Sequence, residues 1–520
     1  MKKLLSLMAV LCLFACGDDG DGGNPSGSGS GITLTLRSQS IAEGSEVDAS
    51  TTTSLTLAYS SMVKVTSDAN ITLNGTKVTA TASVANVTIP LSLTAGTTYT
   101  LKVPKGAIVS TSDANVSAPE LTINFKTKAK VDPQGLNNDA TALAKKLGWG
   151  WNLGNHFDTS SDKDGEPNQW GYWDKSTPTQ TLYQKLKAAG ASTIRIPVTW
   201  GNYQSTTDGN WTIDANYMAE VKQNVEWAEA AGLNVILNIH HDEYWTDIKT
   251  AASNTTVNEN IKARIEKTWK QIAEAFKDKG DFLFFEAFNE VQDGSWGWGA
   301  NRTDGGKQYR TLNEWNQLVV NTIRATGGNN ATRWIGVPGY ASGATFVLIN
   351  EFKLPTDAAN RIMVSVHFYD PGSFCLTPVK DGITEWGHTA TKGKYVEGSN
   401  EDHVVETFQK LQEKFIANNI PVYVGEYGCV LQTSNRSNLF RNYYLEYVCR
   451  AAYTYNLPVC LWDNWDAKTT GGGDEHHYYI NHNDGRFYTD MESLVKLMIK
   501  ATTSDDASYT LETVYNSAPK

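Results

Sequence analysis

One stretch decides the fold of this chain: Asp281-Phe282-Leu283-Phe284-Phe285-Glu286-Ala287-Phe288-Asn289-Glu290. It is apolar and rich in aromatic residues, and it stops abruptly on an amide and a carboxylate. A continuous apolar run of this kind is typical of a parallel strand that is buried on both faces. A buried strand has no internal use for an ionisable end, so we expect Asn289 and Glu290 to face a cleft.

Four further apolar runs end in polar residues in the same way. They are Ile194 to Val198, Val235 to His241, Met363 to Tyr369 and Val422 to Gly428. Polar groups gathered at the carboxyl ends of several parallel strands are typical of an active site on a (β/α)8 barrel. The sequence therefore predicts an α/β fold, a (β/α)8 TIM barrel in which these strand ends share one mouth.

Strand and helix patterns alternate eight times within residues 136–503, which we assign to the barrel domain. The strands centre on residues 149–154, 192–198, 233–240, 282–289, 333–338, 362–369, 421–427 and 458–464. The clearest helical patterns lie at residues 217–231, 261–277, 313–324, 404–418 and 439–455. Eight repeats of a strand followed by a helix close into a barrel.

Six motifs in this region carry a resemblance to a known family. They are Ile194 to Val198, Asn238 to Asp242, Asn289-Glu290, His367 to Tyr369, Gly425 to Gly428 and Trp462-Asp463-Asn464. In this order they resemble glycoside hydrolase family 5, over roughly residues 136 to 502. The opening Gly150-Trp151-Asn152-Leu153-Gly154-Asn155 is similar to the endoglucanase and xyloglucanase branch, subfamily 4.

The resemblance implies a retaining, endo-acting hydrolysis of a β-1,4-glucan by double displacement, without a cofactor. It implies Glu290 as the acid/base and Glu426 as the nucleophile. Two-carboxyl cleavage of a glycosidic bond needs a protonated acid at the leaving oxygen and an ionised partner at the anomeric carbon. We expect burial and a nearby negative charge to raise the pKa of Glu290, and Arg195 to act as the cation that keeps Glu426 ionised.

Other residues at the strand ends are candidates for substrate binding and transition-state support. We expect Asn289 to donate to the sugar 2-hydroxyl, Tyr369 to hydrogen-bond the nucleophile, and His367 to orient the substrate or the acid. Trp462 resembles the sugar-stacking platform of the family. Other tryptophans in predicted loops either line further subsites or simply pack: Trp170, Trp173, Trp245, Trp296, Trp298 and Trp386.

His240, His241 and Asp242 form a run that resembles a metal-binding cluster. Adjacent residues on a strand point to opposite faces, so we expect that His240 and His241 cannot both bind one ion, and that they contact sugar instead. The run Asp474-Glu475-His476-His477 also resembles a metal-binding cluster. We expect it to be an exposed, solvated loop. The prediction is an enzyme without a metal or other cofactor.

The composition limits the class of partner. The chain has 520 residues and a formal net charge of −11, with a pI near 5.4. Surfaces that bind nucleic acid need an excess of Lys and Arg, so this charge argues against a nucleic acid partner. A neutral polysaccharide is not repelled, and we expect a monomer that acts on β-glucan.

The N-terminus has the pattern of an exported lipoprotein. A charged start and a short apolar core predict a signal peptide over residues 1–15, too short to remain as a membrane span. Cys16 follows Leu13-Phe14-Ala15 as in a bacterial lipobox, so we expect lipidation of Cys16 and anchoring in the outer membrane, facing the cell exterior. A plain signal peptide with a chance cysteine is the alternative. Residues 16–31, rich in Gly, Ser and Asp, predict a flexible tether.

The segments around the barrel domain differ from it in composition. Residues 32–128 carry short alternating runs and turn signals such as Asn74-Gly75, and they predict a small all-β sandwich that resembles a bacterial immunoglobulin-like domain. This segment contains no Trp, so we favour a spacer over a carbohydrate-binding role. Residues 129–135 predict a linker, and residues 504–520 a polar C-terminal tail without a structural signal.

Four cysteines remain once Cys12 and Cys16 are set aside with the N-terminus: Cys375, Cys429, Cys449 and Cys460. Outside the cytoplasm a disulfide is permitted, and the sequence does not choose among the three possible pairings. We expect buried free thiols for at least two of them.

The leading hypothesis is a retaining endo-β-1,4-glucanase that cleaves xyloglucan, mixed-linkage glucan or cellulose-type chains. One alternative is a β-mannanase or another specificity of the same family. Another is a non-catalytic surface glycan-binding protein, which we would expect to lack Glu290, Glu426 or Arg195. A structural adhesin led by the β domain would leave the polar strand ends unexplained.

Overall fold

The computed structural model describes residues 33–47, 49, 52–128, 135–159, 176–377, 383–432, 434–464 and 477–520, without the side chain of residue 243. The predicted signal peptide, Cys16, the tether and most of the predicted linker lie outside the described residues. The chain divides into two compact units, Met1–Lys130 and Val131–Lys520. Within the described residues, no helix combines the length and the apolar character needed to cross a membrane.

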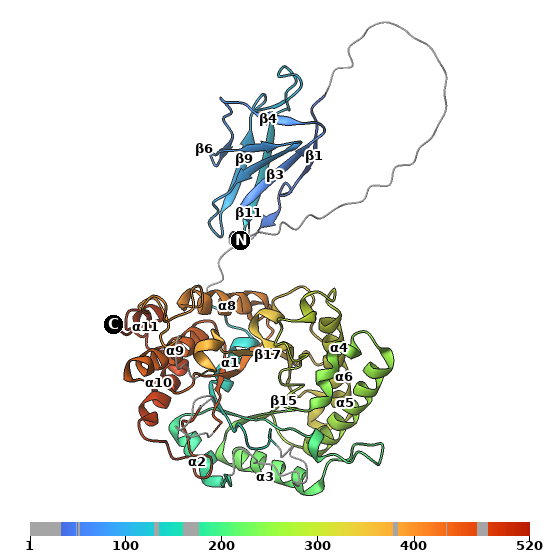
Figure 1. The fold of residues 1–520 in the computed structure, drawn as a ribbon, viewed down its shortest axis with the longest axis vertical. Helices are drawn as coiled ribbons and strands as arrows, with labels where there is room; N and C mark the ends of the chain where they lie inside the picture. Colours follow the sequence, from blue (N-terminus) through green and yellow to red (C-terminus); the bar gives the residue numbers. More distant parts are fainter. Residues whose placement is uncertain are drawn as a thin grey trace. The chain divides into compact units, whose positions relative to one another are not determined.

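The first unit is an all-β sandwich (Figure 1). One sheet has the strand order β1-β3-β8-β7 and another β2-β11-β9-β5-β6, while β10 pairs with β4. In β3, Leu55, Leu57 and Tyr59 alternate with more exposed residues and enter one apolar core, so the period-two pattern is the cause of this fold. The strands are β1 Leu36–Gln39, β2 Glu46–Val47, β3 Ser54–Tyr59, β4 Val63–Val65, β5 Thr72–Leu73, β6 Thr76–Lys77, β7 Thr81–Ser83, β8 Asn86–Pro90, β9 Thr98–Val103, β10 Ile108–Ser110 and β11 Leu121–Thr127.

The second unit is a closed barrel of parallel strands in the order β12 to β19, which confirms the predicted (β/α)8 fold. All residues of β15, β17 and β18 are buried, and this explains their unbroken apolar runs. The strands are β12 Trp149–Asn152, β13 Thr193–Ile196, β14 Asn234–Asn238, β15 Leu283–Glu286, β16 Ile335–Gly343, β17 Ile362–Phe368, β18 Val422–Tyr427 and β19 Val459–Leu461. The strand β15 ends at Glu286, so the last four residues of the opening stretch belong to the barrel mouth.

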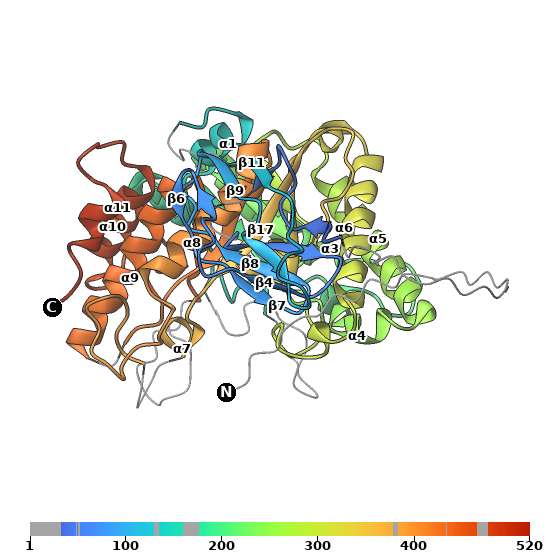
Figure 2. The ribbon, with the colours of Figure 1, turned by 90° about the horizontal axis from the view of Figure 1, so that it is seen from above.

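Helices cover the outside of the barrel, with α5 and α6 together on one side and α9, α10 and α11 on the opposite side (Figures 1 and 2). Buried apolar residues of α5 recur at helical spacing, as in Ile261, Ile265 and Trp269. The helices are α1 Asp139–Leu147, α2 Gln180–Ala189, α3 Ala215–Ala231, α4 Ile248–Ala251, α5 Thr255–Phe276, α6 Lys307–Ala325, α7 Gly372–Cys375, α8 Glu401–Lys414, α9 Asn435–Thr454, α10 Met491–Thr503 and α11 Leu511–Tyr515.

The alternation of strand and helix differs from the prediction at the fifth strand. Between β16 and β17, all of whose residues are described, the chain forms only the short 3-10 helix Ala344–Val347. Pro355 lies in the rest of this connection, where its missing N–H disfavours a continuous helix. Seven strands are therefore followed by an α-helix and one is not.

The helix α1 closes one end of the barrel. Its Leu143 and Leu147 pack in one buried cluster with Ile236, Phe284 and Met363, which lie toward the amino-terminal ends of their strands. The residues two positions further along these strands are polar. The apolar cluster thus forms a floor beneath the mouth of the barrel.

The C-terminal tail, for which we made no structural prediction, is ordered in the structure. It contains α11, whose Val514 is buried in the barrel's core cluster, and Tyr515 stacks on His388 with ring centroids 3.8 Å apart. A capping box between Thr510 and Thr513 begins the helix. This short signal was present in the sequence.

The four cysteines of the barrel unit are all buried and free. Of the alternatives that the sequence left open, buried free thiols therefore hold for Cys375, Cys429, Cys449 and Cys460, and none of the three pairings is formed.

Candidate active site

A fully buried arginine organises the mouth of the barrel. Arg195 lies on β13, and its Nε donates to Glu286 Oε2 at 2.7 Å while its Nη1 donates to Glu426 Oε1 at 2.7 Å. It also donates to Glu286 Oε1 at 3.3 Å, to Asn152 Oδ1 at 3.0 Å and to Asn289 Oδ1 at 2.8 Å. Burial alone would lower the pKa of Arg195, but the charges of Glu286 and Glu426 outweigh it and raise the pKa above its ordinary value.

Two members of this network were missed by the sequence analysis. Glu286 is fully buried and also accepts from Ser365 Oγ at 2.7 Å. Asn152 donates to the backbone oxygen of Gly425 at 3.0 Å and thereby ties β12 to the strand that carries Glu426. A carboxylate within an apolar run was the available signal for Glu286, because a buried charge needs a partner.

Glu426 lies on β18 with each carboxylate oxygen held by a different donor. Arg195 occupies Oε1, and the Tyr369 hydroxyl donates to Oε2 at 3.0 Å. The Oε2 atom also lies 3.6 Å from His367 Nδ1. Arg195 is thus the cation beside Glu426 that the sequence predicted.

Glu290 has a different environment. His367 Nδ1 lies 2.7 Å from its Oε1, and its side chain keeps 18% of its surface exposed at the mouth. Burial raises the pKa of Glu290 to about 7, the Arg195 charge opposes this, and the Glu286 charge adds to it. Burial also lowers the pKa of His367 to about 4, so His367 is neutral at pH 7. The nearby negative charge expected beside Glu290 is that of Glu286.

The two carboxylates face each other. One oxygen of Glu290, one oxygen of Glu426 and a ring nitrogen of His367 all lie within 4.8 Å of one another. Retaining glycosidases hold their carboxyl groups about 5–5.5 Å apart, and inverting enzymes about 6.5–9.5 Å. The closeness of Glu290 and Glu426 therefore favours retention.

The histidine pair does not follow the alternation that we assumed. Because β14 ends at Asn238, His240 and His241 are outside the strand, and their ring centroids lie 4.3 Å apart. Together with Asp158 they bring three possible ligand atoms within 4.8 Å of one another. The reason given for excluding a shared ion was therefore wrong.

The hydrogen bonds of His240 nevertheless arrange it as a donor. Asn238 Oδ1 accepts from the backbone N–H of Val198, so its Nδ2 donates to His240 Nδ1 at 3.1 Å. The ring proton then sits on Nε2, which lies 3.9 Å from both Asp158 Oδ2 and Glu426 Oε1. A metal would need this nitrogen unprotonated, and we conclude that His240 is built to donate.

Asp158 was also missed by the sequence analysis. It is buried, and neither carboxylate oxygen has a hydrogen bond of normal geometry with a described residue. Burial raises its pKa to about 7, although the nearby amide of Asn155 lowers it somewhat.

Trp462 follows β19 at the mouth. Its ring is parallel to that of His240, with an interplanar angle of 3° and centroids 5.8 Å apart. A Cβ at Gly154 would come within 2.9 Å of the Trp462 ring, so the glycine in the opening motif permits this close approach.

The loop tryptophans divide into two groups. Trp245 and Trp386 are buried, so these two pack and do not line an open subsite. Trp296 and Trp298 are exposed at 56% and 80%. Trp170 and Trp173 lie outside the described residues, as do residues 474–476 of the second metal-like run. His477, the last residue of that run, is buried and its N–H donates to Asn464 Oδ1 at 3.1 Å, so the expected exposure is wrong for this residue.

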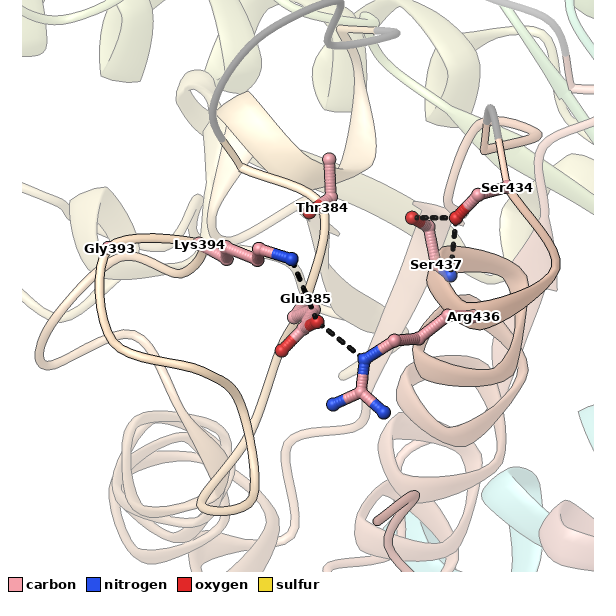
Figure 3. Close-up of a pocket in the computed structure, with 7 residues that line it drawn as sticks. All are labelled: Thr384, Glu385, Gly393, Lys394, Ser434, Arg436 and Ser437. Carbon is pink, nitrogen blue, oxygen red and sulfur yellow. Dashed lines mark hydrogen bonds and ion pairs between the residues drawn. The ribbon is translucent and has the colours of Figure 1, made fainter.

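A surface pocket of about 380 Å³ lies between residues 384–394 and the start of α9, and it includes none of the strand-end residues (Figure 3). Its buried Glu385 accepts from Arg436 Nε at 2.7 Å and lies 3.8 Å from Lys394 Nζ. The charges inside it are paired, and Ser434 caps α9 by accepting from Ser437 N. We interpret this pocket as a structural contact between a loop and a helix.

Comparison with known proteins agrees with this geometry. Residues 155–468 match the family model for cellulase, glycosyl hydrolase family 5. The chain is 34% identical over 344 residues to endoglucanase A of Paenibacillus barcinonensis, covering 62% of this chain and 82% of that protein. It is 33% identical over 370 residues to a xyloglucan-specific endo-beta-1,4-glucanase of Bacteroides ovatus, covering 66% and 71%.

A solved structure extends the comparison. A GH5-4 broad specificity endoglucanase from Bacteroides salanitronis is 43% identical, with a TM-score of 0.65, and covers 71% of this chain and 98% of that chain. The family model spans more than half of the sequence, including the segments that carry Arg195, Glu290 and Glu426. This chain therefore belongs to the cellulase family, glycosyl hydrolase family 5.

Proposed function

We propose that the protein is a retaining endo-β-1,4-glucanase with Glu290 as its acid/base and Glu426 as its nucleophile. The observation that carries this proposal is the unequal environment of two carboxylates that face each other. Glu290 has a pKa raised to about 7, whereas Glu426 lies against Arg195 and Tyr369. One site thus offers an acid and an anion at the same pH.

In the first step a carboxylate oxygen of Glu426 attacks the anomeric carbon. The Oε2 atom is the candidate, because it accepts from the neutral Tyr369 hydroxyl, whereas Oε1 is paired with the charged Arg195. Glu290 gives its proton to the leaving oxygen as the glycosidic bond breaks, and a glycosyl ester of Glu426 forms. Arg195 stabilises the Glu426 carboxylate in the free enzyme, and again when this carboxylate is released from the glycosyl ester.

In the second step a water molecule replaces the leaving sugar. Glu290, now a carboxylate, accepts a proton from this water, whose oxygen attacks the anomeric carbon and releases Glu426. Neutral His367, 2.7 Å from Glu290, keeps the carboxyl in place for both transfers. Two inversions leave the product in the β configuration.

The neighbouring side chains position the sugar ring. Arg195 occupies Oδ1 of Asn289, so the Nδ2 of this amide is the group available to donate to the 2-hydroxyl. Trp462 and His240 present parallel rings. Trp462 stacks on a sugar ring, and His240 and His241 contact sugar hydroxyls.

The substrate is a soluble β-1,4-glucan attacked within the chain, and the protein belongs to subfamily 4. The similarity to a broad specificity endoglucanase and to a xyloglucan-specific endo-beta-1,4-glucanase supports xyloglucan or mixed-linkage glucan. Viscosity and product size on xyloglucan, mixed-linkage glucan, carboxymethylcellulose and mannan test this. A rapid fall in viscosity with products of several units is expected; preference for mannan, or only mono- or disaccharides from the start, would overturn it.

The stereochemistry is tested separately by NMR of the first product formed from a cello-oligosaccharide. We expect the β-anomer before mutarotation. An α-anomer seen first would contradict the assigned mechanism while leaving the substrate class intact.

We propose further that lipidated Cys16 anchors the monomer in the outer membrane, with the immunoglobulin-like unit as a spacer. The lipobox-like run before Cys16 supports this. Several acyl chains on the lipidated cysteine anchor a protein stably without a membrane-spanning helix. The variant Cys16→Ala should leave the membrane fraction, and equal retention of variant and wild type would refute the anchor.

A further inference from the structure

Two tryptophans that follow Glu290 closely along the chain expose large aromatic surfaces. They lie in the segment Gln292 to Arg302, here called the tryptophan loop, which follows β15. Trp296 is 56% exposed and Trp298 80% exposed, and the other exposed large hydrophobics among the described residues include only one aromatic, Tyr515 at 36%. Two large exposed aromatic side chains two residues apart, in a segment that follows a candidate catalytic residue, are candidates for a binding surface.

The tryptophan loop is held in place. The Asp293 carboxylate accepts from the backbone N–H of Ser295 at 3.2 Å and from Gln308 Nε2 at 3.3 Å, and Gln292 Oε1 accepts from the N–H of Trp296 at 3.0 Å. The Asp293 N–H donates to the Tyr340 hydroxyl at 3.0 Å. The exposure of the tryptophans is therefore a property of an ordered loop.

Arg302 holds the second half of the loop. Its Nε donates to the Gly297 oxygen at 2.6 Å, and its guanidinium lies 4.6 Å from the centre of the Trp298 ring and 5.3 Å from that of Phe346. One face of the Trp298 ring is thus supported by a cation. An exposure of 80% leaves most of the ring open to a ligand.

The backbone of the loop is strained at its centre. Trp296 has φ +52°, a left-handed conformation that bulky residues seldom adopt. It precedes Gly297, where a Cβ would collide with the Phe346 ring at 2.2 Å. Strain of this kind persists where surrounding contacts impose it, and it is concentrated at functional sites.

The position of the loop specifies the ligand. Trp296 follows Glu290 by six residues, so the two lie at most about 20 Å apart. Glu290 protonates the leaving oxygen, and the loop continues from the strand end that carries it. We propose that Trp296 and Trp298 form a stacking platform for the leaving-group part of the glucan chain, which makes the tryptophan loop a determinant of polymer affinity; this inference rests on the proposed function.

The test compares substrates with and without sugars on the leaving side. For Trp298→Ala, we expect KM on cellohexaose and mixed-linkage glucan to rise by about fivefold or more. The kcat/KM on an aryl β-cellobioside, which places no sugar there, should change less than about twofold, because the residues that touch its sugars are intact. Trp298→Phe should restore most of the polymer affinity. Trp296→Ala, at the strained position, should act in the same direction.

A matched control removes exposed apolar surface elsewhere in the same unit. Leu439, 58% exposed on α9, provides this control, and Leu439→Ala should leave both substrates unaffected. Equal loss on aryl and polymeric substrates would mean that the loop only supports the fold, and no change on the polymer would refute the platform. Failure of the proposed function is distinguishable, since wild type would then cleave neither substrate.

A second readout isolates the leaving side directly. The wild-type enzyme is trapped as its 2-fluoroglycosyl ester and reactivated either by water alone or by added cellobiose as acceptor. Trp298→Ala should slow reactivation by cellobiose and leave reactivation by water unchanged. Equal slowing of both, or of neither, would contradict the proposal.

Discussion

At the floor of the barrel, Ile236, Phe284 and Met363 pack against α1, whereas two residues further along the same strands the positions are Asn238, Glu286 and Ser365. The floor gains free energy from apolar burial. The mouth buries Arg195 between two carboxylates, which costs solvation and is offset only while every partner is present. The difference shows that stability and chemistry are assigned to opposite ends of the same strands.

The largest expected effect is the loss of the nucleophile at the mouth. Glu426→Ala should lower kcat by about four orders of magnitude or more, because no intermediate can form. Glu290→Ala should retain more activity on aryl glycosides with good leaving groups, since these need little protonation. Steady-state rates on an activated aryl cellobioside check both, and substantial turnover by Glu426→Ala would contradict the assignment.

Removal of Arg195 should damage both stability and activity. In Arg195→Leu, Glu286 and Glu426 are left buried without their cation, and the expected loss is about 3–5 kcal/mol of unfolding free energy. Denaturant titration and aryl glycoside kinetics give the two readouts. A stable variant with little activity would show that the arginine is catalytic alone and not part of the packing.

The variant to compare with Arg195→Leu removes an apolar side chain at the floor of the barrel. Leu147→Ala should cost about 2–5 kcal/mol through the cavity that it leaves, while the kcat of the folded protein stays close to that of wild type. If kcat fell as far as in Arg195→Leu, the separation of the two ends would be wrong.

The smallest expected effect is a pH-dependent gain from Glu290→Gln. The folded pKa of Glu290 is raised from its ordinary 4.5 to about 7, so its contribution to stability is fully present below about pH 4.5 and is lost as pH rises through 7. Glutamine cannot ionise and keeps the neutral shape. At pH 8 the variant should exceed wild type by up to about 3 kcal/mol, and at pH 4 the two should be alike.

The same titration should appear in the kinetics of wild type. Because Glu290 must hold a proton in the free enzyme, kcat/KM should fall as pH rises through about 7. Stability curves at several pH values and a pH profile of kcat/KM measure the two effects independently. A stability difference that does not change with pH would show that Glu290 is not buried as a neutral acid.

Much of the site could be predicted because barrel strands place their carboxyl ends together. The runs that end at Glu290, His367 and Glu426 meet at one mouth, with Arg195 between them. The pattern did not reveal Glu286, because every residue of β15 is buried and an unbroken apolar run does not show which of its faces meets the barrel interior. The two-residue alternation decides which side chains enter the barrel, and a run that is buried on both faces hides that alternation.

Other misses have similar causes. The fate of a loop tryptophan depends on the tertiary packing around it, so Trp386 and Trp298 look alike in sequence although one is buried and the other exposed. The assumption about His240 failed because it applied strand alternation beyond the end of β14. Asp158 is close to His240 only through the three-dimensional arrangement of two loops.

The central claim is that Glu426 forms the covalent intermediate while Glu290 handles the proton. The most direct measurement is inactivation by a 2,4-dinitrophenyl 2-deoxy-2-fluoro-β-cellobioside, followed by peptide mass spectrometry. We predict one glycosyl label per chain, carried by Glu426. A label on any other residue, or turnover without a trapped ester together with an α-configured first product, would contradict the account.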